Sequence, residues 1–232
     1  MEKLSKKRVA VFDIDGTIFR SSLLIELTDA LIQEGVFASK ARETYKRAFD
    51  NWLNRKGSYQ EYLNAVIEAF VKNIKGAGYK DFSKISRKVI SFHGERNYKY
   101  TIDLIKKLKK KNYFVLAISG SPYSAVKGFA EKLGFDKAYG RVLEIENGKF
   151  TGKVLYADLI ENKDKILERA VEKENLTLRG SVGVGDTETD ISFLKMVEKP
   201  ICFNPNQNLY NHAKRNGWEV VVERKDVIYK NI

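Results

Sequence analysis

Apolar residues recur along the chain with two different periods, and these divide it into three stretches. A short β-branched run from Arg8 to Asp13 predicts a buried strand. From Ser21 to about residue 92, apolar residues recur at helical spacing and no segment has a clear strand pattern, so we expect several helices. After residue 93, short apolar strands alternate with helices. The elements predicted there are helices 98–111, 123–133, 163–173, 187–197 and 208–215, strands 113–119, 180–184, 201–203 and 218–222, and a hairpin of strands 139–145 and 149–155 that turns at Asn147-Gly148.

This order of elements predicts an α/β fold: a doubly wound parallel sheet with helices on both faces. The helical stretch stands between the first strand and the rest of the sheet. We therefore assign residues 1–18 and 94–232 to an α/β core domain and residues 19–93 to an inserted helical domain. Because such sheets bind ligands outside the carboxyl ends of their strands, the insertion is expected to lie next to the binding site.

The composition of the 232 residues limits the chemistry that the chain can support. The single cysteine excludes internal disulfides and a cysteine-rich zinc module, and the two histidines exclude a His-rich metal site. Any metal must then be held by carboxylate and carbonyl oxygens. The net charge of +12 is spread along the chain instead of gathered in a tail, so we interpret it as a solvated surface and do not expect a nucleic-acid partner.

No uncharged stretch of the sequence approaches the roughly 20 residues that a membrane span requires. The apolar run from Val9 to Phe12 is too short for the core of a signal peptide. We therefore expect a soluble, cytoplasmic protein with no membrane partner. The sequence does not predict an oligomeric state.

Two acids follow the first predicted strand, in the segment Asp13-Ile14-Asp15-Gly16-Thr17. In an extended segment, residues two apart point the same way, so Asp13 and Asp15 share a face while Ile14 turns toward the core. Two carboxylates this close repel each other unless one is protonated or a cation lies between them. The pair suits a nucleophile and a general acid, although turn or helix-capping aspartates have the same spacing.

A second acidic pair, Asp186 and Asp190, follows the predicted strand 180–184. Asp186 lies in the strand-to-helix turn, and Asp190 is four residues further on, at helical spacing. Carboxylate oxygens are typical ligands of Mg²⁺, so Asp186 is a candidate metal ligand.

Two further segments lie at the ends of predicted elements. Ser119-Gly120-Ser121-Pro122 follows a strand and opens a helix, where a hydroxyl and free backbone N–H groups can bind an anion. Lys163, at the start of the helix 163–173, could neutralise a phosphate, with Lys165 as an equally possible choice. Each segment by itself is a weak signal.

Taken together and in order, these four segments resemble the four motifs of the haloacid dehalogenase superfamily. Asp13-Ile-Asp15-Gly-Thr17 is similar to motif I, Ser119 to motif II, Lys163 to motif III, and Gly185-Asp186 with Asp190 to motif IV. The insertion after motif I resembles a C1-type helical cap. The Ser-Gly-Ser-Pro phrase, the 139–155 hairpin and Phe203-Asn204-Pro205 are similar to the phosphoserine-phosphatase-like branch, subfamily IB.

The resemblance implies a Rossmann-like core and a phosphatase that depends on Mg²⁺ and acts on a small phosphorylated metabolite. It implies that Asp13 attacks phosphorus to give an aspartyl phosphate, and that Asp15 protonates the leaving alcohol and later activates water. Mg²⁺ would be bound by Asp13, by the backbone carbonyl of Asp15 and by Asp186. The remaining implied contacts are Ser119 and Lys163 on the phosphoryl oxygens, Asp190 orienting Lys163, and Gly120, Thr17 and Arg20 as further substrate contacts.

Arg20 stands near the place where phosphoserine phosphatases of this branch carry a glutamate, so we expect phosphoserine not to be the main substrate. Two alternatives stay open at this point. One is a phosphotransferase that passes the phosphoryl group to an alcohol. The other, from a different class, is a basic nucleic-acid-binding protein that keeps an inactive site.

Overall fold

A computed structural model describes residues 6–230, and residues 1–5 of the predicted core domain lie outside it. Its sheet has eight strands in the order β4-β3-β2-β1-β5-β6-β7-β8. The strands from β3 to β7 in this order run parallel, while β4 and β8 are antiparallel strands at the two edges. The bounds are β1 Lys7–Phe12, β2 Phe114–Pro122, β3 Lys137–Glu146, β4 Lys149–Leu155, β5 Leu176–Gly185, β6 Lys199–Phe203, β7 Glu219–Arg224 and β8 Val227–Lys230.

Helices cover both faces of the sheet, as the alternating pattern predicts. The bounds of those that follow β1 are α1 Leu23–Gln33, α2 Glu43–Leu53, α3 Tyr59–Ile74, α4 Tyr79–His93, α5 Lys99–Lys110, α6 Tyr123–Lys132, α7 Ala157–Ile160, α8 Lys163–Lys173, α9 Ile191–Leu194 and α10 Gln207–Asn216, with short 3₁₀ turns η1 Ser39–Arg42 and η2 Glu188–Asp190. Successive side chains of β1 alternate between two apolar clusters. Ala10 and Phe12 pack with residues of α1, α5 and α6, and Val9 and Val11 with residues of α8, α9 and α10. The doubly wound α/β fold is therefore confirmed.

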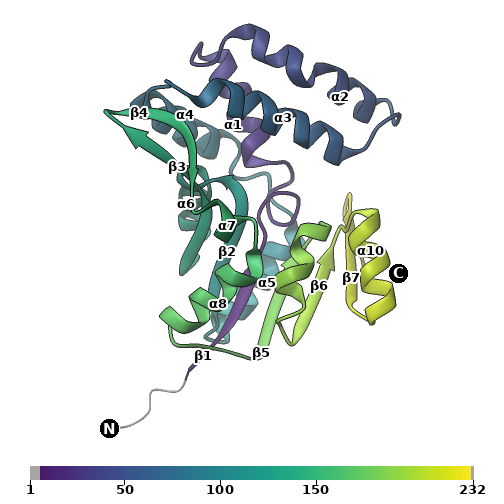
Figure 1. Ribbon diagram of the computed structural model, residues 1–232. Coiled ribbons are helices and arrows are strands. Elements are labelled where there is room, and N and C mark those ends of the chain that lie inside the picture. The colour runs from purple at the N-terminus through teal and green to yellow at the C-terminus, as the bar shows by residue number, and fades with distance from the viewer. Residues whose placement is uncertain (1–5, 231–232) are drawn as a thin grey trace.

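Residues 23–93 form helices, as predicted, and α1–α4 lie together beyond the carboxyl end of β1 (Figure 1). Helix α3 begins at a capping box in which Ser58 and Glu61 each accept a hydrogen bond from the other's backbone N–H. Apolar residues of α1, α3 and α4 share one continuous cluster with Phe12 of the sheet. The division into two domains at residues 18 and 94 stays a prediction.

The predicted hairpin is present, and Asn147 and Gly148 both have the positive φ that its turn requires. Its tip binds the segment between α3 and α4. Phe150 exchanges backbone hydrogen bonds with Gly76 and Ala77, at 2.8 and 3.0 Å, and the N–H of Tyr79 donates to the carbonyl of Gly148 at 2.9 Å. The hairpin thus joins the sheet to the helical insertion.

Three elements differ from the prediction. The helix predicted over 187–197 is divided into η2 and α9, and the carboxylate of Asp190 accepts from the N–H groups of Asp186 and Thr187 at the start of η2. Strand β8 was not predicted, since Val227–Lys230 is short and exposed. The short helix α7 was also missed. Within residues 6–230, none of the helices has the length and apolar character that crossing a membrane demands.

Candidate active site

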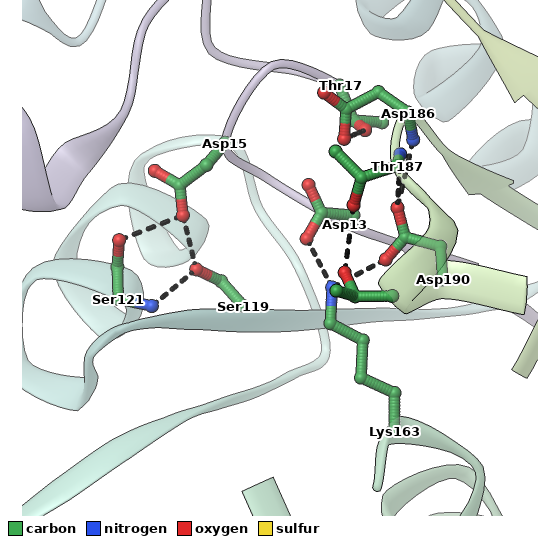
Figure 2. Close-up of polar contacts among 10 residues, drawn as sticks. Asp13, Asp15, Thr17, Ser119, Ser121, Lys163, Asp186, Thr187 and Asp190 are labelled. Atoms are coloured by element: carbon green, nitrogen blue, oxygen red, sulfur yellow. Dashed lines mark hydrogen bonds and ion pairs between the residues drawn. The ribbon is translucent and has the colours of Figure 1, made fainter. Parts of the chain in front are cut away.

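The predicted site residues come from the carboxyl ends of three neighbouring strands. Asp13 follows β1 directly and its N–H donates to the carbonyl of Val184 in β5, at 2.9 Å. Ser119 belongs to the last residues of β2, and Asp186 follows β5. Strand β1 lies between β2 and β5, where the winding of the sheet reverses, and such a position creates a crevice for a ligand. Figure 2 shows these side chains together.

Lys163 lies between two carboxylates. As the first residue of α8, it places its Nζ 2.6 Å from Oδ1 of Asp13 and 2.6 Å from Oδ1 of Asp190. All three side chains are buried. The structure therefore selects Lys163 over the exposed Lys165, a choice that the sequence left open.

Asp190 is fully buried, and both of its carboxylate oxygens accept hydrogen bonds. Oδ1 accepts from Lys163, and Oδ2 accepts from the N–H groups of Asp186 and Thr187 at 2.9 and 3.1 Å. This arrangement orients Lys163 and holds the turn after β5. The turn also needs glycine, because a Cβ on Gly185 would overlap the carboxylate of Asp190.

Asp15 points toward a different group of residues. Its Oδ2 accepts from the hydroxyls of Ser119 and Ser121, at 2.6 and 2.8 Å (Figure 2). Its Oδ1 accepts from the N–H of Leu23 at the start of α1. The hydroxyl of Ser119 in turn accepts from the N–H of Ser121 at 3.0 Å. Asp15 is thus held in one orientation by both the sheet and the insertion.

Burial determines the charge balance of the site. It raises the pKa of Asp13 to about 8, against the opposing effect of Lys163, and the neighbouring acids Asp190 and Asp15 raise it further. Burial also raises the pKa of Asp186, with Asp13 and Asp190 adding to the effect. For Lys163, burial favours the neutral amine, but the charges of Asp13 and Asp190 outweigh it and raise the pKa. A cation among these acids would relieve their repulsion.

The residues present fit a divalent cation. Oxygens of Asp13, Asp186 and Asp190 lie within 4.8 Å of one another, and Oδ2 of Asp13 is buried with no hydrogen-bond partner within the described residues. A buried carboxylate oxygen without a partner is costly unless a cation or a donor reaches it. Carboxylate oxygens are the ligands that Mg²⁺ prefers. Since Asp190 is fully hydrogen-bonded, Asp13 and Asp186 are the acids with capacity to bind a cation.

A cavity of about 290 Å³ opens over this cluster. From the sheet it is lined by Asp13, Asp15, Gly120, Ser121, Lys163 and Asp186. From the other side it is lined by α3 and by the β3–β4 hairpin, which includes Arg141. The candidate nucleophile, acid, lysine and metal ligand therefore share one space.

Three predicted substrate contacts do not line this cavity. Arg20 is exposed, and its guanidinium lies 5.7 Å from the centre of the Tyr98 ring. Thr17 is buried, and its hydroxyl donates to Oδ1 of Asp186 at 3.3 Å. Ser119 is buried and its hydroxyl is engaged with Asp15. In this structure Thr17 and Ser119 position acids, and Arg20 packs on an aromatic ring outside the site.

Two polar residues of the site were not selected from the sequence. Ser121 had a visible signal, since it stands in the same Ser-Gly-Ser-Pro turn as Ser119. Arg141 had none, because a single arginine in a predicted strand is not distinctive. Its Nε donates to the carbonyl of Gly120 at 3.3 Å, which places its charge beside the turn of residues 119–122.

The comparisons agree with this geometry. A family model described as "haloacid dehalogenase-like hydrolase" matches residues 10–195. A phosphoserine phosphatase of Methanocaldococcus jannaschii is 28% identical over 98% of this chain and 96% of its own. A histidinol-phosphatase of Neisseria meningitidis is 24% identical over 93% of this chain and 98% of its own.

A solved structure described as a phospho-aspartyl intermediate analogue of phosphoserine phosphatase superposes with a TM-score of 0.62. It is 27% identical, and the match covers 96% of each chain. The family match and these relatives lead to one conclusion. The chain belongs to the haloacid dehalogenase-like hydrolases and is a phosphatase of the phosphoserine-phosphatase-like type.

Proposed function

We propose that the protein is a Mg²⁺-dependent phosphomonoester hydrolase that works through an aspartyl phosphate on a small phosphorylated metabolite. The observation that carries the proposal is the state of Asp13. One of its oxygens is held by Lys163 at 2.6 Å, and the other is buried beside the cavity with no hydrogen-bond partner among residues 6–230. A carboxylate held in this way is suited to attack a phosphorus atom placed in the cavity.

In the first step an oxygen of Asp13 forms a bond to phosphorus, and the bond from phosphorus to the ester oxygen breaks. The leaving alcohol takes its proton from Asp15, which the hydroxyls of Ser119 and Ser121 and the N–H of Leu23 hold in place. Lys163 offsets negative charge on the phosphoryl oxygens. Phosphoryl transfer depends mainly on such positioning and charge neutralisation.

In the second step a water molecule attacks the phosphorus of the aspartyl phosphate. Asp15, now ionised, removes the proton of this water, and the bond between phosphorus and Asp13 breaks. Inorganic phosphate leaves, and both aspartates return to their starting states. One residue thus serves as acid and then as base.

Asp13 and Asp186 would hold Mg²⁺, and the backbone carbonyl of Asp15 stays a predicted third ligand. When bound, the ion would neutralise phosphate oxygens as a Lewis acid. Thr17 supports this role through its hydrogen bond to Asp186. Glycine at position 16 does so too, because a Cβ there would overlap the same carboxylate.

The names of the relatives support the substrate class. They specify phosphoserine in one case and histidinol phosphate in another, and both compounds are phosphomonoesters of small alcohols. The cytoplasmic location and the lack of a nucleic-acid partner stay predictions from the sequence.

Hydrolysis of a generic aryl phosphate tests the proposal. We expect phosphate release that stops in excess chelator and returns when Mg²⁺ is added, together with a phosphoryl group on the protein that a rapid acid quench traps and that alkali or hydroxylamine removes. Undiminished release in chelator would remove the metal from the proposal. Transfer of the phosphoryl group to an added alcohol, in preference to water, would instead identify a phosphotransferase.

A further inference from the structure

Beyond the acids, the cavity has an apolar wall that the proposed chemistry does not use. This wall comes from α3, from the β3–β4 hairpin at one edge of the sheet, and from α7 (Figure 1). Its apolar members are Leu63, Ile67, Phe70, Val71 and Ile74 of α3, Leu143 and Val154 of the hairpin, and Ile160 of α7. We call this set the apolar wall.

The α3 members form a continuous stripe along the helix. Tyr59, Leu63, Ile67, Phe70 and Ile74 follow one another at intervals of three or four residues, which places them on one face. At 1.5 Å per residue, the stripe from Tyr59 to Ile74 is about 22 Å long. It is therefore long enough to accompany an extended chain.

The stripe has one end at the acids. Tyr59 lines the cavity together with Asp15 and Asp186, and the charges of these acids add to burial in raising its pKa. Its other end is Ile74, next to the segment that the hairpin binds. The stripe therefore leads away from the reacting atoms, in the direction that the alcohol part of an ester would take.

The wall is held by bonds that do not depend on a ligand. Besides the backbone bonds of Phe150 to Gly76 and Ala77, the ring of Phe150 packs edge-to-face on Phe82 of α4, with centroids 4.8 Å apart. Gly152 lines the cavity with φ of +89°, and a Cβ there would crowd Lys75. The hairpin and α3 are thus fixed against each other.

Of the six charged side chains that line the cavity, Asp13, Asp15, Lys163 and Asp186 belong to the acid cluster. The other two are Arg141, bound to the carbonyl of Gly120, and the exposed Glu161. The ammonium and carboxylate groups of an amino acid phosphate bound along the apolar wall would face mainly aliphatic side chains. Burying unpaired charges in such surroundings is unfavourable.

We infer that the site selects phosphomonoesters whose alcohol part is an elongated apolar group, bound along the apolar wall. The inference rests on the proposed function for its phosphate end. It adds that Leu63, Ile67, Phe70 and Val71 determine specificity. Each buried methylene of the alcohol then contributes to binding through apolar surface removed from water.

A series of n-alkyl phosphates from methyl to hexyl, with O-phospho-L-serine for comparison, tests this directly. We expect kcat/KM to rise about two- to fourfold for each methylene, and hexyl phosphate to exceed phosphoserine by at least tenfold. A flat or falling series, or a preference for phosphoserine, overturns the inference. Such a result would leave the proposed phosphatase chemistry standing.

Two variants assign the effect to the wall. Leu63→Asn keeps the size of the side chain but makes it polar, and Val71→Thr does so at a half-exposed position where folding is not at risk. We expect either variant to lower the gain per methylene to below about twofold. Glu68→Gln, on the exposed side of the same helix, is the matched control and should keep the full gain. Equal gains in all three variants and the parent overturn the inference.

Binding of n-alkylphosphonates, measured by calorimetry, separates the two proposals, because a phosphonate cannot be hydrolysed. Tighter binding with chain length supports the apolar subsite even if no ester is turned over. No turnover of any ester would instead refute the proposed function. Affinity independent of chain length refutes the subsite whatever the activity.

Discussion

The two walls of the cavity differ in how their residues interact. On the wall formed by the carboxyl ends of the strands and the start of α8, Asp13, Asp15 and Lys163 are fixed by short hydrogen bonds to groups more than a hundred residues away in the sequence. On the wall formed by α3 and the hairpin, apolar side chains face the cavity with no directional bond. The first wall holds its polar groups in a defined geometry, which suits catalysis. The second wall offers a long apolar surface, which suits selection among substrates.

We call the first wall the polar wall. Among changes to its residues, replacing Asp13 by asparagine should have the largest effect on activity. An amide oxygen is a poor nucleophile and the residue would lose its charge, so we expect kcat to fall by at least about a thousandfold. The fall in kcat is measured by the hydrolysis of an aryl phosphate, and circular dichroism shows whether the variant keeps its fold. Asp103→Asn, at an exposed acid of α5, is the control and should keep the parent rate. A fully active Asp13→Asn protein would contradict the mechanism.

Lys163→Met should lower both activity and stability. The change leaves Asp13 and Asp190 buried without their cation, which costs about 3–5 kcal/mol when one partner of a buried pair is removed. We expect kcat to fall about a hundredfold and the free energy of unfolding in urea to drop by that amount. Lys165→Met, two residues away on the surface, should change neither by much. Equal effects at the two positions would show that the buried pair does not matter.

The pH dependence of stability should reflect the titration of Asp13 on the first wall, because the apolar wall has no titratable side chain. The pKa of Asp13 is about 8 in the folded metal-free protein and near 3.8 when unfolded, so the folded state binds the extra proton between these values. Stability of the metal-free protein should therefore fall as the pH rises from about 4 to 8. We expect a melting temperature several degrees lower at pH 8 than at pH 5.5, with Mg²⁺ raising it more at pH 8. A melting temperature that rises with pH, measured by scanning calorimetry in chelator, would contradict this.

The smallest expected effects are changes in KM on replacing Arg141 or Arg20, and they should differ between the two residues. Arg141 lines the cavity, so Arg141→Ala should raise KM for an anionic substrate about fivefold. Arg20 lies outside it on Tyr98, and Arg20→Ala should change KM by less than twofold. Steady-state kinetics on one aryl phosphate is sufficient for both. A larger change at Arg20 than at Arg141 would restore the sequence-based assignment and contradict the structure.

The polar wall could be predicted because its residues follow strands closely in the sequence. Asp13, Ser119 and Asp186 each stand where a recognisable apolar strand ends, and parallel strands bring such ends together. The sequence did not predict which residues each of these polar side chains would bind. Asp15 pairs with Ser121 as well as Ser119, and Lys163 is distinguished from Lys165 by its burial and its ion pairs with Asp13 and Asp190.

The sequence predicted that the α3 residues of the apolar wall form a helix, but it did not predict that they border a cavity. The spacing of Leu63, Ile67 and Phe70 is the same whether the face packs on protein or borders a cavity. Phe70 packs on Phe82 in the interior of the insertion and also lines the cavity. Periodicity shows that a helix has an apolar face but not what lies opposite it.

The backbone pairing of Phe150 with Gly76 and Ala77 has a consequence for any attempt to exchange modules between related enzymes. A graft of the helices alone would leave N–H and C=O groups of the hairpin tip without their acceptors and donors, which is unfavourable where water cannot replace them. The segment 75–79 and the hairpin 137–155 therefore have to be transplanted as a pair. In chimeric phosphatases built on this chain, residues far apart in sequence would form a single exchangeable part.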